Sequence, residues 1–394
     1  MAFDKMIVKK LLKKFDDIPF VLKFPDGEEF QVGQGEPQAI IRANGGIEMG
    51  AVMKSPSLAL GEAYMDKVLE LEQGNLFDIL NMVLEKLEDF SSDFSGLTKI
   101  MKTSISKKNQ KQEIATHYDI GNAFFELWLD KTMSYSCAYF KKENDTLYDA
   151  QVNKVDYILK KLNLKEGQTL LDIGCGWGYL LLTAVKKYHV KGVGITLSEE
   201  QYKKGQERIK AAGLEDQVEI RLMDYRDLEK SGLSFDRIVS VGMLEHVSRE
   251  NYALFFKNID KVLNKKGMVL LHYISGRHEH DGDPWIKKYI FPGGVIPSLR
   301  EIIHLIGEYN YYTLDVESLR RHYEKTLLEW AKNYAAKRDV ISGMFEERFV
   351  RMWELYLVSC ASVFHNGVCD LHQILFTKGV NNTLHMTREY LYED

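Results

Sequence analysis

At residues 169–178 the chain reads TLLDIGCGWG. The first five residues predict a buried β-strand, and the glycines that follow let the backbone turn tightly and approach a ligand closely. A dinucleotide fingerprint, G-x-G-x-x-G, would place its third glycine at position 179, but the chain has Tyr179 there and its glycine one residue earlier. The stretch therefore predicts a strand–turn–helix unit with a ligand-binding loop, and it argues against a nicotinamide dehydrogenase.

The residues around this stretch alternate short apolar runs with amphipathic stretches. This alternation indicates a mostly parallel sheet covered on both faces by helices. Residues 275–345 break the rhythm, and we expect them to form a helical insertion or lid near the site. The predicted strands are 169–173, 190–195, 218–222, 237–241, 268–274 and 371–377, and the predicted helices are 179–188, 198–212, 252–263 and 346–364.

The first hundred residues have a different character. Two short strands, 20–24 and 29–32, flank a Pro-Asp-Gly turn, and helices are predicted at 58–71 and 75–90. We therefore expect a small α+β domain at 1–95, a Ser- and Lys-rich linker at 96–113, and a catalytic domain at 114–394.

Residues 1–15 place apolar side chains on one side of a helical wheel and lysines on the other. Two interpretations of this basic amphipathic helix stay open. It packs on its own domain as a surface helix, or it binds anionic lipid, where each lysine contributes about 1 kcal/mol. The apolar residues are Phe3, Ile7, Val8, Leu11 and Phe15, and the basic ones are Lys5, Lys9, Lys10, Lys13 and Lys14.

The composition of the 394 residues excludes several classes of protein. A make-up of 45% hydrophobic and 28% charged residues is typical of a folded globular protein. No apolar run reaches the roughly 18 residues of a membrane span, and the formal net charge of −5 provides no general attraction to nucleic acid. The four cysteines lie far apart, so we expect no disulfide framework, no metal site and a reducing, cytoplasmic location.

The phrase LLDIGCGWG resembles the first motif of the seven-stranded methyltransferases that bind S-adenosylmethionine. The resemblance implies a Rossmann-like α/β fold and cofactor contacts at Asp172, Gly174 and Gly176. The charges of these residues fit that cofactor. An acid beside the loop suits an ammonium and a sulfonium cation, while backbone donors suit a carboxylate.

In that class the second strand commonly ends in an acid that binds the ribose hydroxyls, but this chain has Thr196 and Leu197 there. We therefore expect Thr196, or Gln201 one turn into the next helix, to supply the polar contacts. Ser198 alone is also explained as a helix N-cap. After the third strand come Asp224, Tyr225 and Arg226, where such folds hold the adenine.

Further phrases resemble the cyclopropane fatty acid synthases and the mycolic acid cyclopropane synthases, from about Ile114 to the end of the chain. The N-terminal domain and the segment 284–292 point to the branch that modifies phospholipids. The resemblance implies methylene transfer to unsaturated phospholipid, peripheral association with the inner face of the cell membrane, and a homodimer. The phrases are HYDIGN at 117–122, MSYSCAYF at 133–140, SVGMLEHV at 240–247, LHYI at 271–274 and RMWELYL at 351–357.

The resemblance also implies a bound bicarbonate ion as general base, because a strong protein base beside S-adenosylmethionine would itself be alkylated. The implied ligands are the backbone amide of Cys137, the side chains of Glu245, His272 and Tyr356, and the backbone of Ile274. Tyr135 and Ser136 are implied as cofactor contacts, and the faces of Tyr135 and Tyr139 would stabilise a carbocation.

Taken singly, each of these residues has an ordinary structural explanation: Cys137 as a small buried hydrophobe, His272 as a core histidine. Two other functions also stay open, a lipid C-methyltransferase that gives methyl-branched chains and a non-catalytic lipid-binding protein. Acyl-chain length, double-bond position and headgroup preference are not encoded in any of these motifs.

Overall fold

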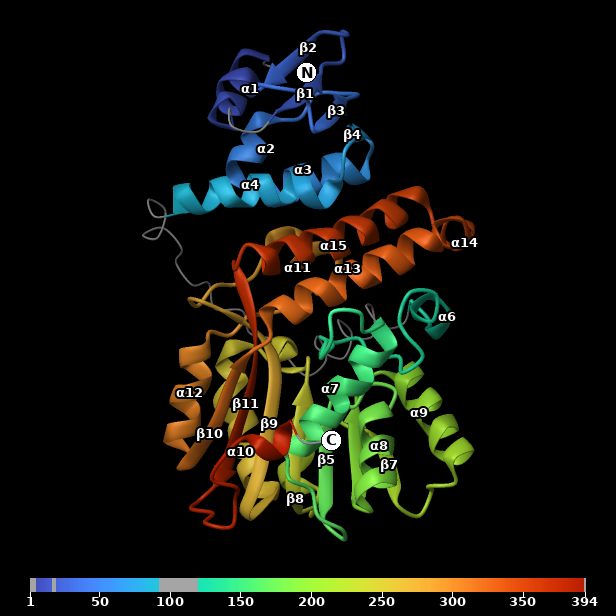
Figure 1. The fold of residues 1–394 in the computed structure, drawn as a ribbon, viewed down its shortest axis with the longest axis vertical. Helices are drawn as coiled ribbons and strands as arrows, with labels where there is room; N and C mark the ends of the chain where they lie inside the picture. The colour runs from blue at the N-terminus through green and yellow to red at the C-terminus, as the bar shows by residue number, and fades with distance from the viewer. Residues whose placement is uncertain (1–4, 16–18, 92–119, 393–394) are drawn as a thin grey trace. The chain divides into compact units, whose positions relative to one another are not determined.

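The structure, a computed structural model, describes residues 5–15, 19–91 and 120–392, without the side chains of 11, 14 and 86–91. The chain forms two compact units (Figure 1). Unit 1 comprises Met1–Lys99, Gly282–Pro292 and Leu327–Val368, and unit 2 comprises Ile100–Asp281, Gly293–Thr326 and Cys369–Asp394. The predicted linker at 96–113 and the start of the motif at 117–122 lie outside the described residues.

Unit 2 is built on a seven-stranded sheet of order β10-β11-β9-β8-β5-β6-β7. The five strands from β5 to β9 run parallel, and the two edge-side strands β10 and β11 are antiparallel to their neighbours. The predicted seven-stranded α/β fold is confirmed. The strands are β5 (Thr169–Ile173), β6 (Lys191–Thr196), β7 (Val218–Leu222), β8 (Phe235–Val241), β9 (Leu263–Gly276), β10 (Tyr311–Ser318) and β11 (Cys369–Lys378).

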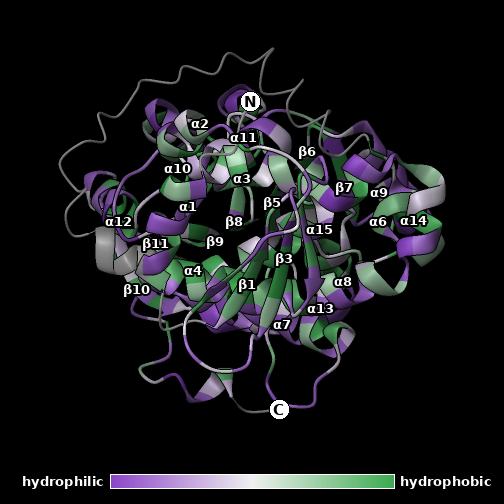
Figure 2. Cartoon of the chain, turned by 90° about the horizontal axis from the view of Figure 1, so that it is seen from above, coloured by the Kyte–Doolittle hydropathy of each residue, from purple (hydrophilic) through white to green (hydrophobic). Residues whose placement is uncertain are grey.

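Helices cover both faces of this sheet (Figure 1), as short apolar strands require. Alternate residues of β5 serve the two faces: Leu170 packs in the core layer that contains Leu181, and Leu171 in the layer that contains Phe255. Figure 2 shows hydrophobic residues along the central strands and hydrophilic ones on the outer faces of the helices. The helices are α6 (Asn122–Phe125), α7 (Leu147–Lys161), α8 (Tyr179–Tyr188), α9 (Glu199–Ala212), α10 (Tyr252–Val262) and α12 (Leu299–Glu308).

The predicted insertion at 275–345 is largely helical, but it also contributes a strand that no pattern indicated. Strand β10 extends the main sheet by pairing with β11, and α12 lies on the same face as α10. The sequence pattern does not indicate this strand, because its apolar side chains are exposed: Tyr312 is 52% and Leu314 is 38% exposed. Three further helices, α13 (Arg320–Ala336), α14 (Arg338–Met344) and α11 (Pro284–Tyr289), complete the segment.

Unit 1 holds a four-stranded sheet of order β2-β1-β3-β4. The predicted helix at 58–71 is too long, because α3 ends at Met65, Lys67 takes a φ of 58°, and the next residues pair with β3 as a strand. Trp285 packs so closely on α3 that a Cβ on Gly61 would lie 2.5 Å from its ring. The elements are β1 (Phe20–Lys23), β2 (Glu29–Val32), β3 (Ala39–Ala43), β4 (Leu69–Gln73), α1 (Lys5–Leu12), α2 (Met49–Lys54), α3 (Pro56–Met65), α4 (Leu76–Ser91) and α15 (Glu347–His365).

The N-terminal helix α1 packs on its own unit. Val8 and Leu12 contact the small core around Leu22 and Phe24. Lys5 forms ion pairs with Asp26 and Glu28, and Lys9 pairs with Glu28. In the parts of the chain that the structure describes, no helix has the length and hydropathy needed to cross a membrane.

Candidate active site

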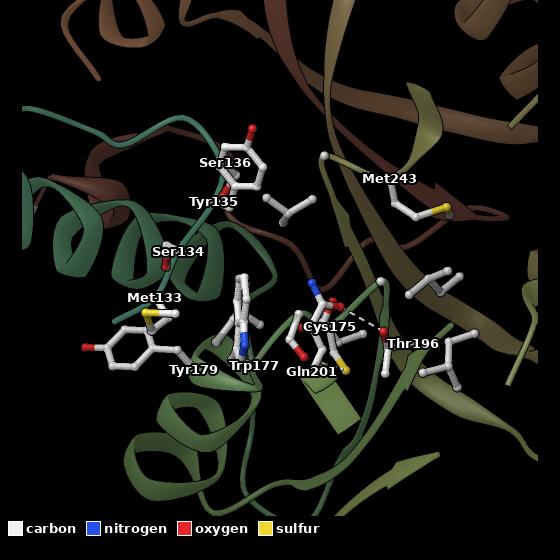
Figure 3. Close-up of a pocket in the computed structure, with 18 of the residues that line it drawn as sticks. Met133, Ser134, Tyr135, Ser136, Cys175, Trp177, Tyr179, Thr196, Gln201 and Met243 are labelled. Carbon is white, nitrogen blue, oxygen red and sulfur yellow. Dashed lines mark hydrogen bonds between the residues drawn. The ribbon is translucent and has the colours of Figure 1, made fainter. Parts of the chain in front are cut away.

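A cavity opens in unit 2 at the carboxyl ends of β5 and β6, where open α/β sheets bind their ligands. Its walls come from the glycine loop after β5, the segment Thr132–Ser136, the start of α9 and the turn after β8 (Figure 3). Lys154 of α7 and Asp172 of β5 also line it. The structure therefore brings the predicted cofactor motifs of three strands to one place.

The glycine loop is shaped for close approach of a ligand. Gly174, Gly176 and Gly178 all have positive φ angles, of 81°, 54° and 81°. A Cβ on Gly174 would lie 2.8 Å from Met243 Cγ, whereas one on Gly176 would meet nothing within 4 Å and would enter the cavity that this residue lines. Trp177 in the same loop donates from Nε1 to Asn122 Oδ1 at 2.7 Å, which ties the loop to α6.

Asp172 is 2% exposed, and its Oδ1 has no hydrogen-bond partner among the described residues. Burial raises the pKa of its carboxyl to about 7, and the nearby Lys154 opposes that rise. An unpaired buried carboxylate oxygen is costly unless a ligand supplies a donor. Asp172 thus fits the ammonium of S-adenosylmethionine.

At the end of β6, the Thr196 hydroxyl donates to Gln201 Oε1 at 2.8 Å (Figure 3). Ser198 caps α9 by accepting from the Gln201 amide at 3.2 Å, so the N-cap explanation and a binding role for Gln201 hold together. The structure gives Gln201 Nε2 no acceptor among the described residues. Gln201 therefore keeps two amide protons at the cavity, where other folds of this class use an acid. Leu197 lines the same wall.

After β7, Tyr225 lines the cavity and packs edge-on against Phe255 at 5.4 Å. Asp224 does not line it: both of its oxygens accept from the Arg226 guanidinium, at 2.9 and 2.6 Å. Of these three predicted residues, the geometry leaves Tyr225 in position to contact a cofactor and assigns the other two to an ion pair that braces the turn.

Tyr135 and Ser136 both line the cavity. Tyr135 packs against Phe125 and Trp128, at ring distances of 5.6 and 5.4 Å. The Ser136 hydroxyl accepts from Lys154 Nζ at 2.8 Å. No sequence motif predicted Lys154, because nothing in the local pattern of the amphipathic helix α7 marks this lysine as buried.

A second cluster of unpaired polar atoms lies on the turn after β8 and on β9. Glu245 Oε1 accepts from the backbone N–H of Ile274 at 2.6 Å, while Oε2 is buried without a partner among the described residues. His272, two residues before Ile274 on β9, is 1% exposed, and its Nε2 is likewise unpaired. Burial raises the pKa of Glu245 to about 7 and holds the pKa of His272 well below its ordinary value.

The neutral ring of His272 has its other nitrogen engaged across the sheet. Gln373 Nε2 lies 3.1 Å from His272 Nδ1, at the position that faces His272 in the β9–β11 register. With the amide donating to Nδ1, the ring carries its proton on Nε2. Gln373 is a further site residue that no motif indicated.

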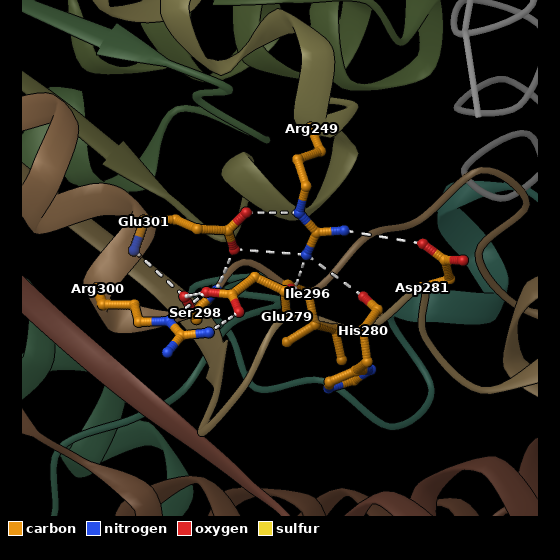
Figure 4. Close-up of polar contacts among 8 residues, drawn as sticks. All are labelled: Arg249, Glu279, His280, Asp281, Ile296, Ser298, Arg300 and Glu301. Carbon is orange, nitrogen blue, oxygen red and sulfur yellow. Dashed lines mark hydrogen bonds and ion pairs between the residues drawn. The ribbon is translucent and has the colours of Figure 1, made fainter. Parts of the chain in front are cut away.

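Arg249 contacts Glu301 and the backbone of Ile296 (Figure 4). Its guanidinium donates to Glu301 Oε1 at 2.5 Å and to the carbonyl of Ile296 at 3.2 Å. The adjacent Val295 N–H donates to the carbonyl of Glu245 at 2.9 Å. Val295 and Ile296 thereby hold the turn that carries Glu245.

Cys137 is fully buried, and burial raises the pKa of its thiol well above the ordinary value. Its Sγ lies against the carbonyls of Ala138 and Leu319, at 3.3 and 3.9 Å. Tyr139 stacks between Tyr157 and His322 rather than lining the cavity.

Tyr356 lies on α15 in unit 1. There it is 3% exposed and packs edge-on against Phe291 and Trp353. The structure thus joins Glu245 to Ile274 directly and sets His272 on the same strand, while Tyr356 belongs to the other unit.

Comparison with known proteins now identifies the family. A family model described as mycolic acid cyclopropane synthetase matches residues 105–374. The chain belongs to this family. A second model, described only as a domain of unknown function, matches residues 7–95.

Relatives of similar length exist outside mycobacteria. The chain is 39% identical to a probable fatty acid methyltransferase of Pseudomonas putida over 385 residues, 95% of this chain and 96% of that protein. It is 39% identical to the cyclopropane-fatty-acyl-phospholipid synthase of Escherichia coli K12 over 359 residues, 90% and 92% of the two chains.

Solved structures agree with this assignment. A mycolic acid cyclopropane synthase complexed with SAH and CTAB matches at 35% identity and a TM-score of 0.64, covering 68% of this chain and 98% of that one. The cyclopropane synthase MmaA2 of Mycobacterium tuberculosis matches at 33% identity and a TM-score of 0.64, with the same coverage. The predicted family and enzyme class are confirmed: the protein is an S-adenosylmethionine-dependent methyltransferase.

Proposed function

We propose that the enzyme transfers a methylene group from S-adenosylmethionine to the cis double bond of unsaturated phospholipid acyl chains, forming cyclopropane fatty acids, with bound bicarbonate as general base. The observation that carries the proposal is the pair of unpaired buried atoms, Glu245 Oε2 and His272 Nε2. Glu245 stands next to the cofactor cavity, since Met243 and His246 on either side of it line the cavity. His272 pairs in the sheet with Val241, which also lines the cavity.

S-adenosylmethionine supplies an electrophilic methyl group, and bicarbonate supplies a base for the proton released when the ring closes. The chain's own part is to hold the anion without adding a side chain that would be methylated. His272 Nε2–H donates one hydrogen bond to it. Glu245, whose pKa is about 7, donates a second as a protonated carboxyl. The backbone N–H of Cys137, which has no acceptor among the described residues, and the Tyr356 hydroxyl complete the proposed set.

The cation that forms on the acyl chain needs protection from water and from side-chain nucleophiles. Tyr135 lines the cavity, and the rings of Phe125 and Trp128 pack against it. Such faces attract a cation through their quadrupoles. Because Tyr139 is stacked between two other rings, we assign this role to Tyr135.

The second candidate is a lipid C-methyltransferase, favoured by the names of two relatives: the Pseudomonas putida protein, and a tuberculostearic acid methyltransferase of Mycobacterium tuberculosis that is 36% identical over 283 residues. Incubation with labelled S-adenosylmethionine and vesicles of unsaturated phospholipid separates the candidates by mass spectrometry. Cyclopropanation adds one methylene per chain and makes the product resistant to ozonolysis, whereas a branched product that keeps an alkene is cleaved. No cofactor turnover would favour a lipid-binding protein without catalysis.

The enzyme reaches its substrate, in this proposal, at the inner face of the cell membrane through the exposed side of α1. Met6 is 78% and Ile7 is 43% exposed, and Lys10 and Lys13 are exposed beside them. Since Lys5 and Lys9 are paired with acids of unit 1, Lys10 and Lys13 carry the charge that faces anionic lipid.

The double variant Lys10→Glu/Lys13→Glu should lower affinity for vesicles containing phosphatidylglycerol by about 30-fold or more, since each lysine contributes about 1 kcal/mol. Co-sedimentation at low salt measures this, and the difference should shrink at 1 M salt, where the Debye length is about 3 Å. Lys141→Glu/Lys142→Glu, an exposed pair in unit 2, is the matched control. Equal binding by both double variants would show that α1 only packs on its own unit and does not bind lipid.

Cys137→Ser should retain most of the activity, at least about a third of the wild-type kcat. The thiol is buried against two carbonyls, and the proposed contribution of this residue is its backbone N–H. Steady-state kinetics together with mass spectrometry of the intact protein checks this. Loss of all turnover with unchanged cofactor binding, or a trapped thioether, would make Cys137 a nucleophile.

A further inference from the structure

Lys154 is a buried cation with unused donors. It lies on α7, is 3% exposed and lines the cofactor cavity. Its ammonium has three N–H donors, and the structure assigns one of them, to Ser136 Oγ at 2.8 Å. No carboxylate of the described residues lies within ion-pair distance of it. Burying such a group is costly unless a partner of opposite charge arrives.

Lys161, further along the same helix α7, shows what a fully paired lysine looks like in this fold. It is 1% exposed, and its Nζ contacts Asp315 at 3.0 Å and Glu317 at 2.5 Å, both on β10. The two lysines are similarly buried, yet among the described residues only Lys161 has carboxylate partners. The difference indicates that the partner of Lys154 is not among the described residues, and a bound ligand can supply it.

Asp172 has the complementary deficiency in the same cavity. Its Oδ1 is buried without a donor among the described residues, and it does not form an ion pair with Lys154. The cavity therefore presents one carboxylate and one ammonium, each with spare hydrogen-bonding capacity. A ligand with one positive and one negative group satisfies both, and an α-amino acid is such a ligand.

We propose that Lys154 binds the α-carboxylate of the methionine moiety of S-adenosylmethionine, while Asp172 receives the α-ammonium. The inference rests on the cofactor and not on the acyl substrate or bicarbonate. The loop backbone contributes further donors to the carboxylate. Burial lowers the pKa of Lys154 to about 8, which leaves the side chain mostly charged at neutral pH.

Three ligands measured by calorimetry test this assignment without any turnover. S-adenosylhomocysteine carries both charged groups, its decarboxylated analogue keeps only the ammonium, and 5′-methylthioadenosine lacks both. Lys154→Met should lower affinity for S-adenosylhomocysteine by about 10- to 150-fold, as loss of a charge-assisted hydrogen bond predicts. Affinity for the decarboxylated analogue and for 5′-methylthioadenosine should stay within about threefold.

Two further variants keep the outcome interpretable. Lys161→Met, monitored by thermal unfolding, should destabilise the fold without changing the preference among the three ligands. Lys154→Arg keeps a charge and should restore part of the preference for S-adenosylhomocysteine, which covers the case in which Lys154→Met fails to fold. Equal losses for all three ligands, or an unchanged affinity for S-adenosylhomocysteine, would overturn the proposal. Failure of the wild-type enzyme to bind S-adenosylhomocysteine would instead contradict the cofactor assignment itself.

Discussion

Replacing Glu245 with Gln should lower kcat by about 10²- to 10⁴-fold, because the proposed bicarbonate base would be held less well and a positioned general base contributes that range. The introduced amide would preserve, through its oxygen, the contact with the Ile274 N–H that Glu245 Oε1 makes at 2.6 Å. The amide nitrogen would replace Oε2 as a hydrogen-bond donor, but its geometry and acidity differ from those of a protonated carboxyl. Because the side chain does not line the cofactor cavity, affinity for S-adenosylhomocysteine should change by less than about threefold.

The wild type and Glu245→Gln should differ in how kcat depends on pH. Burial raises the pKa of Glu245 to about 7, so the carboxyl is protonated and able to donate below that pH. As pH rises above about 7, the carboxyl loses its proton and repels an anion, and kcat of the wild type should fall. Glu245→Gln cannot ionise, and its much lower kcat should lack this alkaline decline.

The dependence of turnover on bicarbonate concentration provides a second test of the proposed base. Degassed, bicarbonate-depleted buffer should slow the wild-type enzyme, and added bicarbonate should restore it, whereas Glu245→Gln and Tyr356→Phe should respond less. Glu250→Gln is the matched control, since Glu250 is exposed five residues further on. If wild-type turnover is untouched by bicarbonate removal, the base is a protein side chain, and His272 is the first candidate.

Gly176→Val should abolish measurable cofactor binding, a loss of at least about 100-fold. The added side chain would occupy cavity space, because Gly176 lines the cavity and a Cβ there meets no protein atom within 4 Å. Its φ of 54° adds strain, since a β-branched residue is disfavoured in the left-handed region. Calorimetry with S-adenosylhomocysteine measures the loss on protein shown by circular dichroism to be folded.

Gly213→Val separates the two effects of that substitution. Gly213 ends α9 with a φ of 64° and is likewise free of neighbours within 4 Å of a Cβ, but it does not line the cavity. It should suffer the same backbone strain and bind the cofactor normally. Unchanged affinity in a folded Gly176→Val protein would mean that the glycine loop does not hold the cofactor.

Local patterns predicted the central part of the sheet closely. The strand Thr169–Ile173, the helix Tyr179–Tyr188 and the strand Val218–Leu222 lie where the sequence places them. Each is an apolar run or an amphipathic repeat bounded by turn residues, so the information is contained within a few neighbouring residues. The same locality explains Ser198 as an N-cap and the glycine turn after β5.

Patterns failed where pairing with a distant segment overrides local preference. Residues 69–71 fall within the helix predicted at 58–71, yet they belong to β4, which pairs with β3. Strand β10 has exposed apolar residues because it is an edge strand, which a sequence cannot reveal.

For the site, the sequence alone determined the class of cofactor and several residues that line its cavity, since the glycine turn, Asp172 and the family motifs are contiguous phrases. Only the tertiary structure decided which polar groups are left unpaired. Asp224 is paired with Arg226, and Lys161 is paired with acids of β10. Nδ1 of His272 is hydrogen-bonded to Gln373, whereas Lys154 keeps unused donors. The physical reason is that hydrogen-bond satisfaction depends on side chains brought together across the fold, so a residue's availability for a ligand is a property of its surroundings and not of its own stretch of sequence.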